Sequence, residues 1–91
     1  MLMFRVESDD FESIGIFDGD LLVADRSAEP LDGQLVIASV GRRRVVRRFE
    51  QKGGRKFLMG GGEADEPVEL CEGGGASVLA VVTHAIPTVD D

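Results

Sequence analysis

The stretch Ser-Asp-Asp-Phe-Glu-Ser, which begins at residue 8, places two hydroxyl groups and three carboxylates within six positions. A serine attacks a carbonyl group only when a neighbouring base removes its proton. Ser8 and Ser13 are therefore candidate nucleophiles that need such a base. An acid–base site built from Asp9, Asp10 and Glu12 is a second candidate, but clustered carboxylates are more often solvated.

Bases that could serve such a serine are scarce in this sequence. The only lysines, Lys52 and Lys56, stand on or beside a predicted hairpin loop, where they would be exposed to solvent. His84 is the only histidine, and neither a carboxylate nor a cysteine is tied to it by spacing. A lone histidine on a strand is more often structural than catalytic, so the sequence indicates no obvious partner for either serine.

Metal and cofactor sites are not expected. With Cys71 and His84 as the sole cysteine and histidine, neither a disulfide nor a Cys/His zinc site can be assembled within the chain. Asp18 and Asp20 flank a glycine, but two carboxylates are a weak calcium signal and are typical of a turn. The glycine-rich segments 60–67 and 73–75 lack the following helix of a phosphate-binding loop, and we interpret them as flexible connections.

Charge is distributed unevenly along the chain. The net charge is -7, there is no Trp or Tyr, and yet five of the eight arginines fall within residues 42–48, whereas residues 62–72 and 89–91 are acidic. The overall charge disfavours direct nucleic-acid binding and favours a protein partner or self-association. We interpret residues 42–49 first as a charged edge or hairpin strand that resists unwanted β-pairing. The alternative is a surface for an acidic protein partner, for which Arg42, Arg44 and Arg48 are the candidate partner-binding residues.

Short β-branched segments separated by Gly, Asp and Pro predict a mostly β fold of twisted antiparallel strands. One helical turn is expected at residues 10–15, capped by Asp9 or Asp10. We expect one domain (1–91) that is cytoplasmic, since the sequence contains neither a membrane-spanning segment nor a secretory signal. The strands are predicted at residues 2–6, 20–25, 34–40, 43–50, 55–59, 67–71 and 77–86, with a hairpin loop at 50–56.

The order of three motifs resembles that of a known family. "GIFDGDLLVADRSAEPLDGQLVIASV" (15–40), "VVRRF" (45–49) and "VVTHAI" (81–86) are similar to the peptidase domain of the LexA/UmuD family, the S24 self-cleaving serine peptidases. The resemblance covers nearly the whole chain. It implies a LexA/signal-peptidase-like β-rich fold, and it allows the catalytic positions of the family to be compared with this sequence.

The resemblance fails at the catalytic dyad. The Gly-Asp-Ser-Met stretch that presents the family's serine falls on residues 8–11, which puts Asp10 at the nucleophile position, and the general-base lysine falls on Arg47. Arginine stays protonated and has no acceptor, and a carboxylate has no proton to give up. We therefore expect no Ser-Lys catalysis. We predict instead a salt bridge between Asp10 and Arg47; the alternative is that Asp10 lies in a mobile surface loop and Arg47 is solvated.

Other family features are also missing from the sequence. It has no Ala-Gly or Cys-Gly bond, and we expect neither the cleavable N-terminal arm nor a helix-turn-helix domain, although the chain could be a fragment of a longer protein. The resemblance implies a catalytically inactive, homodimeric protein-binding module whose partners are a translesion DNA polymerase or RecA in the SOS response. Val82, His84 and Ile86 in the C-terminal strand are the candidate dimer residues.

Two alternative functions remain open. The first is an orphan oligomerisation domain left by a phage-type or LexA-like repressor. The second is an active serine peptidase with a shifted nucleophile, Ser8 or Ser13, although the missing lysine counts against it.

Overall fold

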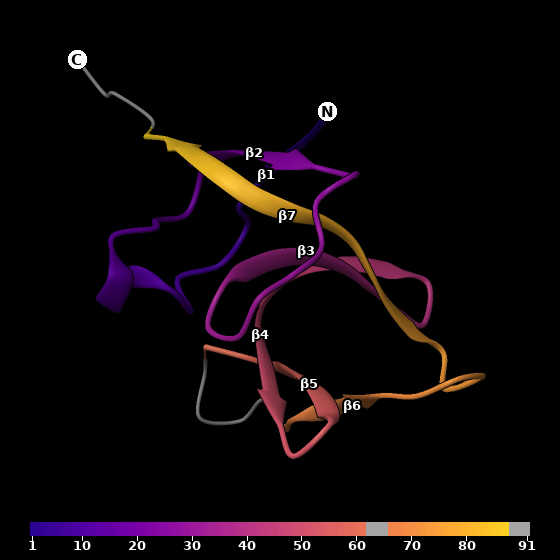
Figure 1. The fold of residues 1–91 in the computed structure, drawn as a ribbon. Coiled ribbons are helices and arrows are strands. Elements are labelled where there is room, and N and C mark those ends of the chain that lie inside the picture. Colours follow the sequence, from indigo (N-terminus) through magenta and orange to yellow (C-terminus); the bar gives the residue numbers. More distant parts are fainter. Residues whose placement is uncertain (62–65, 88–91) are drawn as a thin grey trace.

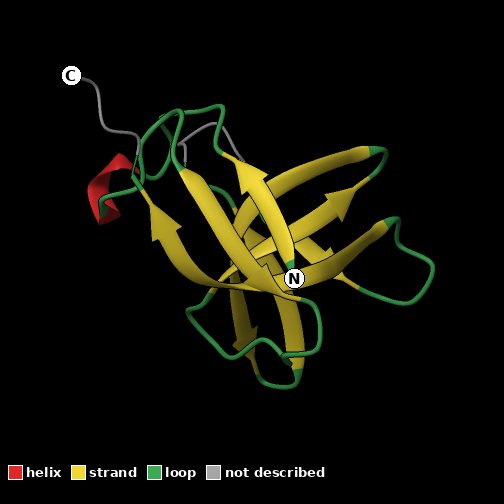
Figure 2. Ribbon diagram, turned by 90° about the horizontal axis from the view of Figure 1, so that it is seen from above, coloured by secondary structure: helices red, strands yellow, loops and turns green. Residues whose placement is uncertain are grey.

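The computed structural model describes residues 1–61 and 66–87, which form one seven-stranded antiparallel sheet (Figures 1 and 2). The strand order is β1-β2-β7-β3-β4-β5-β6. The elements are β1 (Leu2–Arg5), η1 (Glu12–Ile14), β2 (Leu21–Asp25), β3 (Leu35–Val40), β4 (Arg43–Lys52), β5 (Arg55–Met59), β6 (Val68–Leu70) and β7 (Ala76–Ile86). The prediction of a mostly β, antiparallel fold with at most one short helical turn is confirmed.

Two local predictions need correction. The helical turn is a single 3-10 turn that begins after Phe11, and neither Asp9 nor Asp10 caps it, because no side chain bonds to its first backbone N–H groups. The predicted loop at 50–56 is shorter than expected. Gly53 and Gly54, with φ of 57° and 81°, form a two-residue turn, so β4 extends to Lys52 and pairs there with Arg55. Such turns need two left-handed residues, which glycine supplies without strain.

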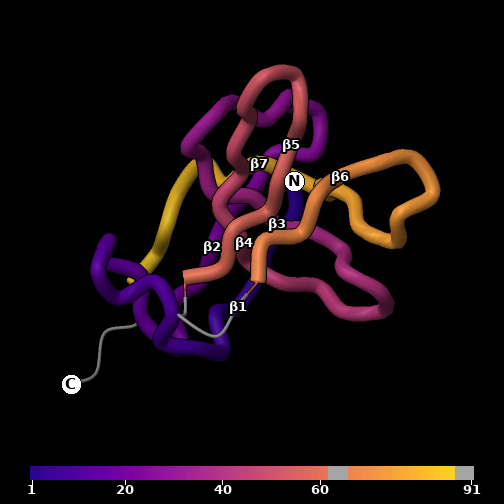
Figure 3. Tube along the Cα trace, turned by 90° about the horizontal axis from the view of Figure 1, so that it is seen from below, coloured from indigo at the N-terminus to yellow at the C-terminus, as the bar shows by residue number. Residues whose placement is uncertain are grey.

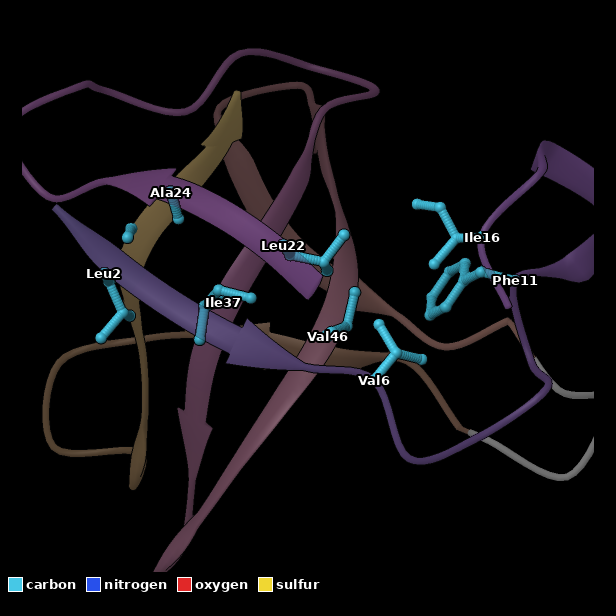
Figure 4. Packing of buried hydrophobic residues seen from close by; sticks show 9 residues of the cluster. Leu2, Val6, Phe11, Ile16, Leu22, Ala24, Ile37 and Val46 are labelled. Carbon is cyan, nitrogen blue, oxygen red and sulfur yellow. The ribbon is translucent and has the colours of Figure 1, made fainter. Parts of the chain in front are cut away.

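The sheet has a hydrophobic core on each face. Successive side chains in a strand point to opposite faces, so neighbouring residues of β3 and β7 enter different cores. The first cluster contains Leu2, Val6, Phe11, Ile16, Leu22, Ala24, Ile37, Val46 and Ala80 (Figure 4). The second contains Val36, Ala38, Phe49, Leu58 and Val81. Burial on both faces explains why β3 reads as a nearly continuous apolar run.

The longest strand, β7, joins the two halves of the sheet (Figure 1). Its first part, Ala76 to Val81, pairs with β3, and its second part, Val81 to Ile86, pairs with β2. A register shift interrupts each pairing, opposite Val23 and Ala24 of β2 and opposite Ile37 and Ala38 of β3. The extra residue lies on β7 both times, at Thr83 and at Leu79. Bulges increase the local twist, and here they let one long strand follow two differently oriented neighbours.

Strand β6 forms one edge of the sheet and is attached to β5 by a cross-strand ion pair. Arg55 donates two hydrogen bonds to the carboxylate of Glu69, at 3.0 and 2.6 Å. This hydrogen-bonded guanidinium lowers the pKa of Glu69 below its ordinary value of 4.5. Across the described part of the chain, no helix is both long and apolar enough to cross a membrane.

We expect Glu69→Gln to lower the melting temperature modestly at pH 7, with the difference from wild type shrinking as the pH falls. Because the folded pKa of Glu69 lies below its ordinary value of 4.5, the stabilising contribution is present above pH 4.5 and is lost as the pH falls through the lowered folded pKa. Thermal unfolding between pH 7 and pH 3 measures this. Glu72→Gln, on the exposed loop after β6, is the control, and a Glu69→Gln difference that is constant with pH would contradict the charge argument.

Candidate functional site

A cleft of about 290 Å³ lies between the chain that leaves β1 and the first half of β4. One side is formed by Phe4, Val6, Glu7, Ser8 and Asp10, and the other by Arg43, Arg44, Val45, Val46 and Arg47. We call this site the β1–β4 cleft. Figure 4 shows Val6 and Val46 side by side in the first core, and both belong to the lining of this cleft.

The long connection from β1 to β2 carries Asp10 and is held in place at its base and at its far end. Val6 donates its N–H to the carbonyl of Asp20 (2.8 Å) and accepts the N–H of Gly19 (2.7 Å), which closes the base of the loop. Phe11 and Ile16 are buried and anchor its far end in the first core (Figure 4). Asp10 thus follows a fixed strand and directly precedes a buried aromatic residue.

The Asp-Gly-Asp segment is a turn, as the sequence indicated. Gly19 has φ of 91°, and the buried carboxylate of Asp20 accepts the N–H of Phe17 at 2.9 Å. Asp18 is exposed. Within the described ranges, His, Cys, Asp and Glu side chains form no group of three that could hold a metal ion.

Sequence reasoning missed one contact at the cleft. Gly61, in the connection from β5 to β6, lies directly against the backbone of Asp10: a Cβ at position 61 would overlap the Asp10 carbonyl oxygen. Any larger residue would push one of the two segments away. The interpretation of this glycine-rich segment as a connection did not include such a contact, and residues 62–65 lie outside the described part. Only the glycine itself signals this contact in the sequence.

Asp10 and Arg47 line the same cleft, as the family spacing predicted, but the predicted salt bridge between them is not formed. Both side chains are half-buried. The Nη1 of Arg47 donates to the carbonyl of Val46 at 2.7 Å, so this guanidinium is directed to its own strand. The ion pairs among the described residues are Lys52–Glu50 and Arg55–Glu69. The alternative was that Asp10 lies in a mobile surface loop and Arg47 is solvated; in the structure the Asp10 backbone lies against Gly61 and Arg47 is half-buried.

The two candidate nucleophiles lie in different places. Ser8 is exposed and lines the cleft, whereas Ser13 is exposed on η1 and is not part of the lining. Neither lysine reaches the cleft lining. Lys52 lies five positions beyond Arg47 on β4, which corresponds to about 16 Å of extended strand, and Lys56 lies on β5 beyond the hairpin turn.

The three candidate partner-binding arginines differ in position and exposure. Arg42 occupies the tight turn between β3 and β4, Arg44 is exposed and lines the cleft, and Arg48 is half-buried. The turn is held from the side by a hydrogen bond from Gly41 N–H to the Gly75 carbonyl (2.9 Å), which places it beside the β6–β7 loop (Figure 3). Strand β4 pairs with β3 along Arg43–Arg48 and with β5 along Arg48–Lys52, so among the described strands its arginine-bearing first part keeps one edge unpaired, as expected for a charged edge or hairpin strand.

The C-terminal strand presents a mixed surface. Val82 is half-buried and packs against the first core, whereas His84 and Ile86 are exposed. His84 Nδ1 lies 3.0 Å from Thr83 Oγ1. Beyond Val81, the described part of β7 pairs only with β2, so one of its edges is open.

These features define an all-β, peptidase-like domain in which the loop after the first strand meets β4 across a cleft. Residues 1–82 match the family model described as Peptidase S24-like, and the chain belongs to this family. It is similar to LexA repressors, with 40% identity over 68 residues to that of Shewanella piezotolerans and 38% to that of Aliivibrio fischeri. These alignments cover 75% of this chain and 33% of each relative, so the chain spans about a third of their length.

Proposed function

We propose that this chain is a catalytically inactive S24 peptidase-like domain that acts as a dimeric protein-binding module. The observation that carries the proposal is the composition of the β1–β4 cleft, where Asp10 and Arg47 occupy the positions at which the family resemblance expects a serine and a lysine. The family match and the similarity to LexA repressors support the comparison of positions.

Elementary chemistry supports the loss of activity. A lysine acts as a base when burial lowers its pKa enough for the neutral amine to form. An arginine side chain remains charged and offers only donors, and in this cleft one donor of Arg47 is already bound to a backbone carbonyl. Ser8 is the serine in the cleft lining, and no lysine or histidine lines the cleft with it.

We expect a serine-directed fluorophosphonate probe to leave the wild-type protein unlabelled, because no base activates a serine in the cleft. The Asp10→Ser/Arg47→Lys double variant should be labelled above this background, and in-gel fluorescence measures both. Labelling of the wild type that disappears in Ser8→Ala or Ser13→Ala would establish the shifted nucleophile instead. An unlabelled double variant that is still folded would contradict the assignment of positions 10 and 47.

The open edge of β7 supports the proposed homodimer. An exposed strand edge leaves N–H and C=O groups unpaired, and a second copy related by a two-fold axis can satisfy them along residues 82–86. Val82, His84 and Ile86 are the proposed interface residues. Ile86 is 49% exposed although it is large and apolar, which fits a residue that a partner covers.

We expect Ile86→Glu to weaken dimerisation at least about tenfold, because the two-fold axis would bring two buried carboxylates into one interface. Sedimentation velocity over a concentration series measures the dimer dissociation constant. Ile14→Glu is the matched control, since Ile14 is 47% exposed but lies on η1, away from β7. Equal dissociation constants for the two variants would place the interface elsewhere.

The proposed partners are a translesion DNA polymerase or the RecA filament in a cytoplasmic SOS response. The support is the similarity to LexA repressors together with the exposed basic residues of the β3–β4 hairpin. Arg42, Arg44 and Arg48 are the proposed partner contacts. Direct nucleic-acid binding is not proposed, because the chain carries a net charge of -7.

Purified RecA filaments or a purified translesion polymerase should retain the wild-type protein in a co-sedimentation or capture assay. Arg44→Glu/Arg48→Glu should lose retention, whereas Lys52→Glu/Lys56→Glu makes the same change of charge on the β4–β5 hairpin and should not. Retention of all three proteins would contradict the proposed contacts. Retention of none, with an intact dimer, would favour the orphan oligomerisation domain of a repressor.

A further inference from the structure

The outer edge of β1 is free. Val6 directs both of its backbone groups toward the β2 side, to Asp20 and Gly19. Since successive strand residues direct these groups to opposite sides, Met3 and Arg5 present their N–H and C=O groups to the open side. Strand β1 is the first strand in the sheet order, and β2 is the only described strand that pairs with it. This edge can accept one more extended segment.

The β1–β4 cleft overlaps this open edge, because Phe4 lies between Met3 and Arg5 on β1 and also lines the cleft. Phe4 and Val6 contribute apolar surface to the lining on the β1 side, and Val45 and Val46 contribute it on the β4 side. The polar lining is unequal in charge, with three arginines (43, 44 and 47) against two carboxylates (Glu7 and Asp10). The cleft therefore carries a formal charge of +1 in a chain whose net charge is -7.

The guanidinium groups keep most of their donors available. Arg43 and Arg44 are exposed, and within the described residues neither forms an ion pair or a side-chain hydrogen bond. Arg47 is half-buried and commits one of its five N–H donors to the Val46 carbonyl. A guanidinium with free donors matches a carboxylate in shape and charge, and two parallel hydrogen bonds form when the two meet face to face.

We infer that the β1–β4 cleft binds an extended, acidic peptide segment of another protein. The backbone of the segment pairs with the open edge of β1, and its carboxylates bond Arg43, Arg44 and Arg47. This pairing follows the general mode in which main-chain hydrogen bonds give affinity and alternate side chains give specificity. The inference rests on the proposed function, because a bound segment stays in place only if the cleft does not cleave it.

Two features of the cleft favour a peptide over a nucleic acid. Glu7 and Asp10 stand on the wall opposite the arginines, where they would repel a continuous phosphate backbone. The chain has no Trp or Tyr on which bases could stack. A peptide with spaced carboxylates can place each negative charge next to an arginine and neutral residues next to Glu7 and Asp10.

The test uses a fluorescein-labelled pentapeptide, Glu-Val-Glu-Val-Glu with blocked ends, whose carboxylates all lie on one face when it is extended. Its neutral counterpart is Gln-Val-Gln-Val-Gln. We expect fluorescence anisotropy to give at least about tenfold tighter binding for the acidic peptide, with affinity falling as salt is added. N-methylation of the amides that would pair with β1 should weaken binding of the acidic peptide by a similar factor.

Protein variants then locate the site. Arg44→Gln should weaken binding of the acidic peptide about tenfold, and so should Arg47→Gln, whereas Arg26→Gln removes an exposed arginine outside the cleft and should leave the affinity unchanged. Thermal unfolding establishes that each variant is folded. If Arg47→Gln is unstable, the comparison of wild type with Arg44→Gln is sufficient, because Arg44 is exposed.

The outcomes separate this inference from the proposed function. Equal binding of the acidic and neutral peptides, or equal binding to wild type and Arg44→Gln, would overturn the inference. So would tighter binding of a single-stranded oligonucleotide that depends on the same arginines. Mass spectrometry of the incubated peptide tests the proposed function independently: a cleaved peptide would overturn that function, whereas an intact peptide that does not bind would overturn only the inference.

Discussion

The backbone hydrogen bonds that β7 makes with two different neighbours are the constraint on which the structure depends. In the strand order, β7 is the only described strand that connects the β1–β2 pair to the β3–β6 group. The same bonds set the distance across the cleft, because β1 reaches β4 only by way of β2, β7 and β3. In addition, Val6, which follows β1, and Val46 of β4 pack in the first core, and this contact holds the two walls of the cleft together.

The individual strands of this fold can be predicted from the sequence, because Gly, Asp and Pro residues, which favour turns, separate the β-branched segments. Gly19 has a positive φ in the turn that the sequence predicted, and Gly33 and Gly41, also with positive φ, lie just outside the ends of the predicted strand at 34–40. The β3 segment could be assigned because a continuous apolar run suits a strand that is buried on both faces. The predicted strand at 43–50 ends two residues before β4 does, because two neighbouring glycines are compatible with either a loop or a tight turn.

Contacts between distant segments were harder to predict, and the cleft shows why. The spacing of family motifs brought Asp10 and Arg47 to the same cleft, since spacing fixes where a residue stands on a strand. The spacing does not fix a side-chain rotamer. In the structure the Arg47 guanidinium donates to the Val46 carbonyl on its own strand and forms no ion pair with Asp10. The approach of Gly61 to Asp10 depends on how two loops pack in three dimensions, which no local pattern encodes.

The double pairing of β7 also has a consequence for how the protein is made. During synthesis β2 and β3 precede residues 76–86, so until those residues have emerged each of the two strands has one edge unpaired. Apolar strands with open edges associate readily with other chains. A chain that still lacks β7 is therefore exposed to aggregation and to chaperone binding, and the β1–β2 pair can join the β3–β6 group only after β7 has emerged.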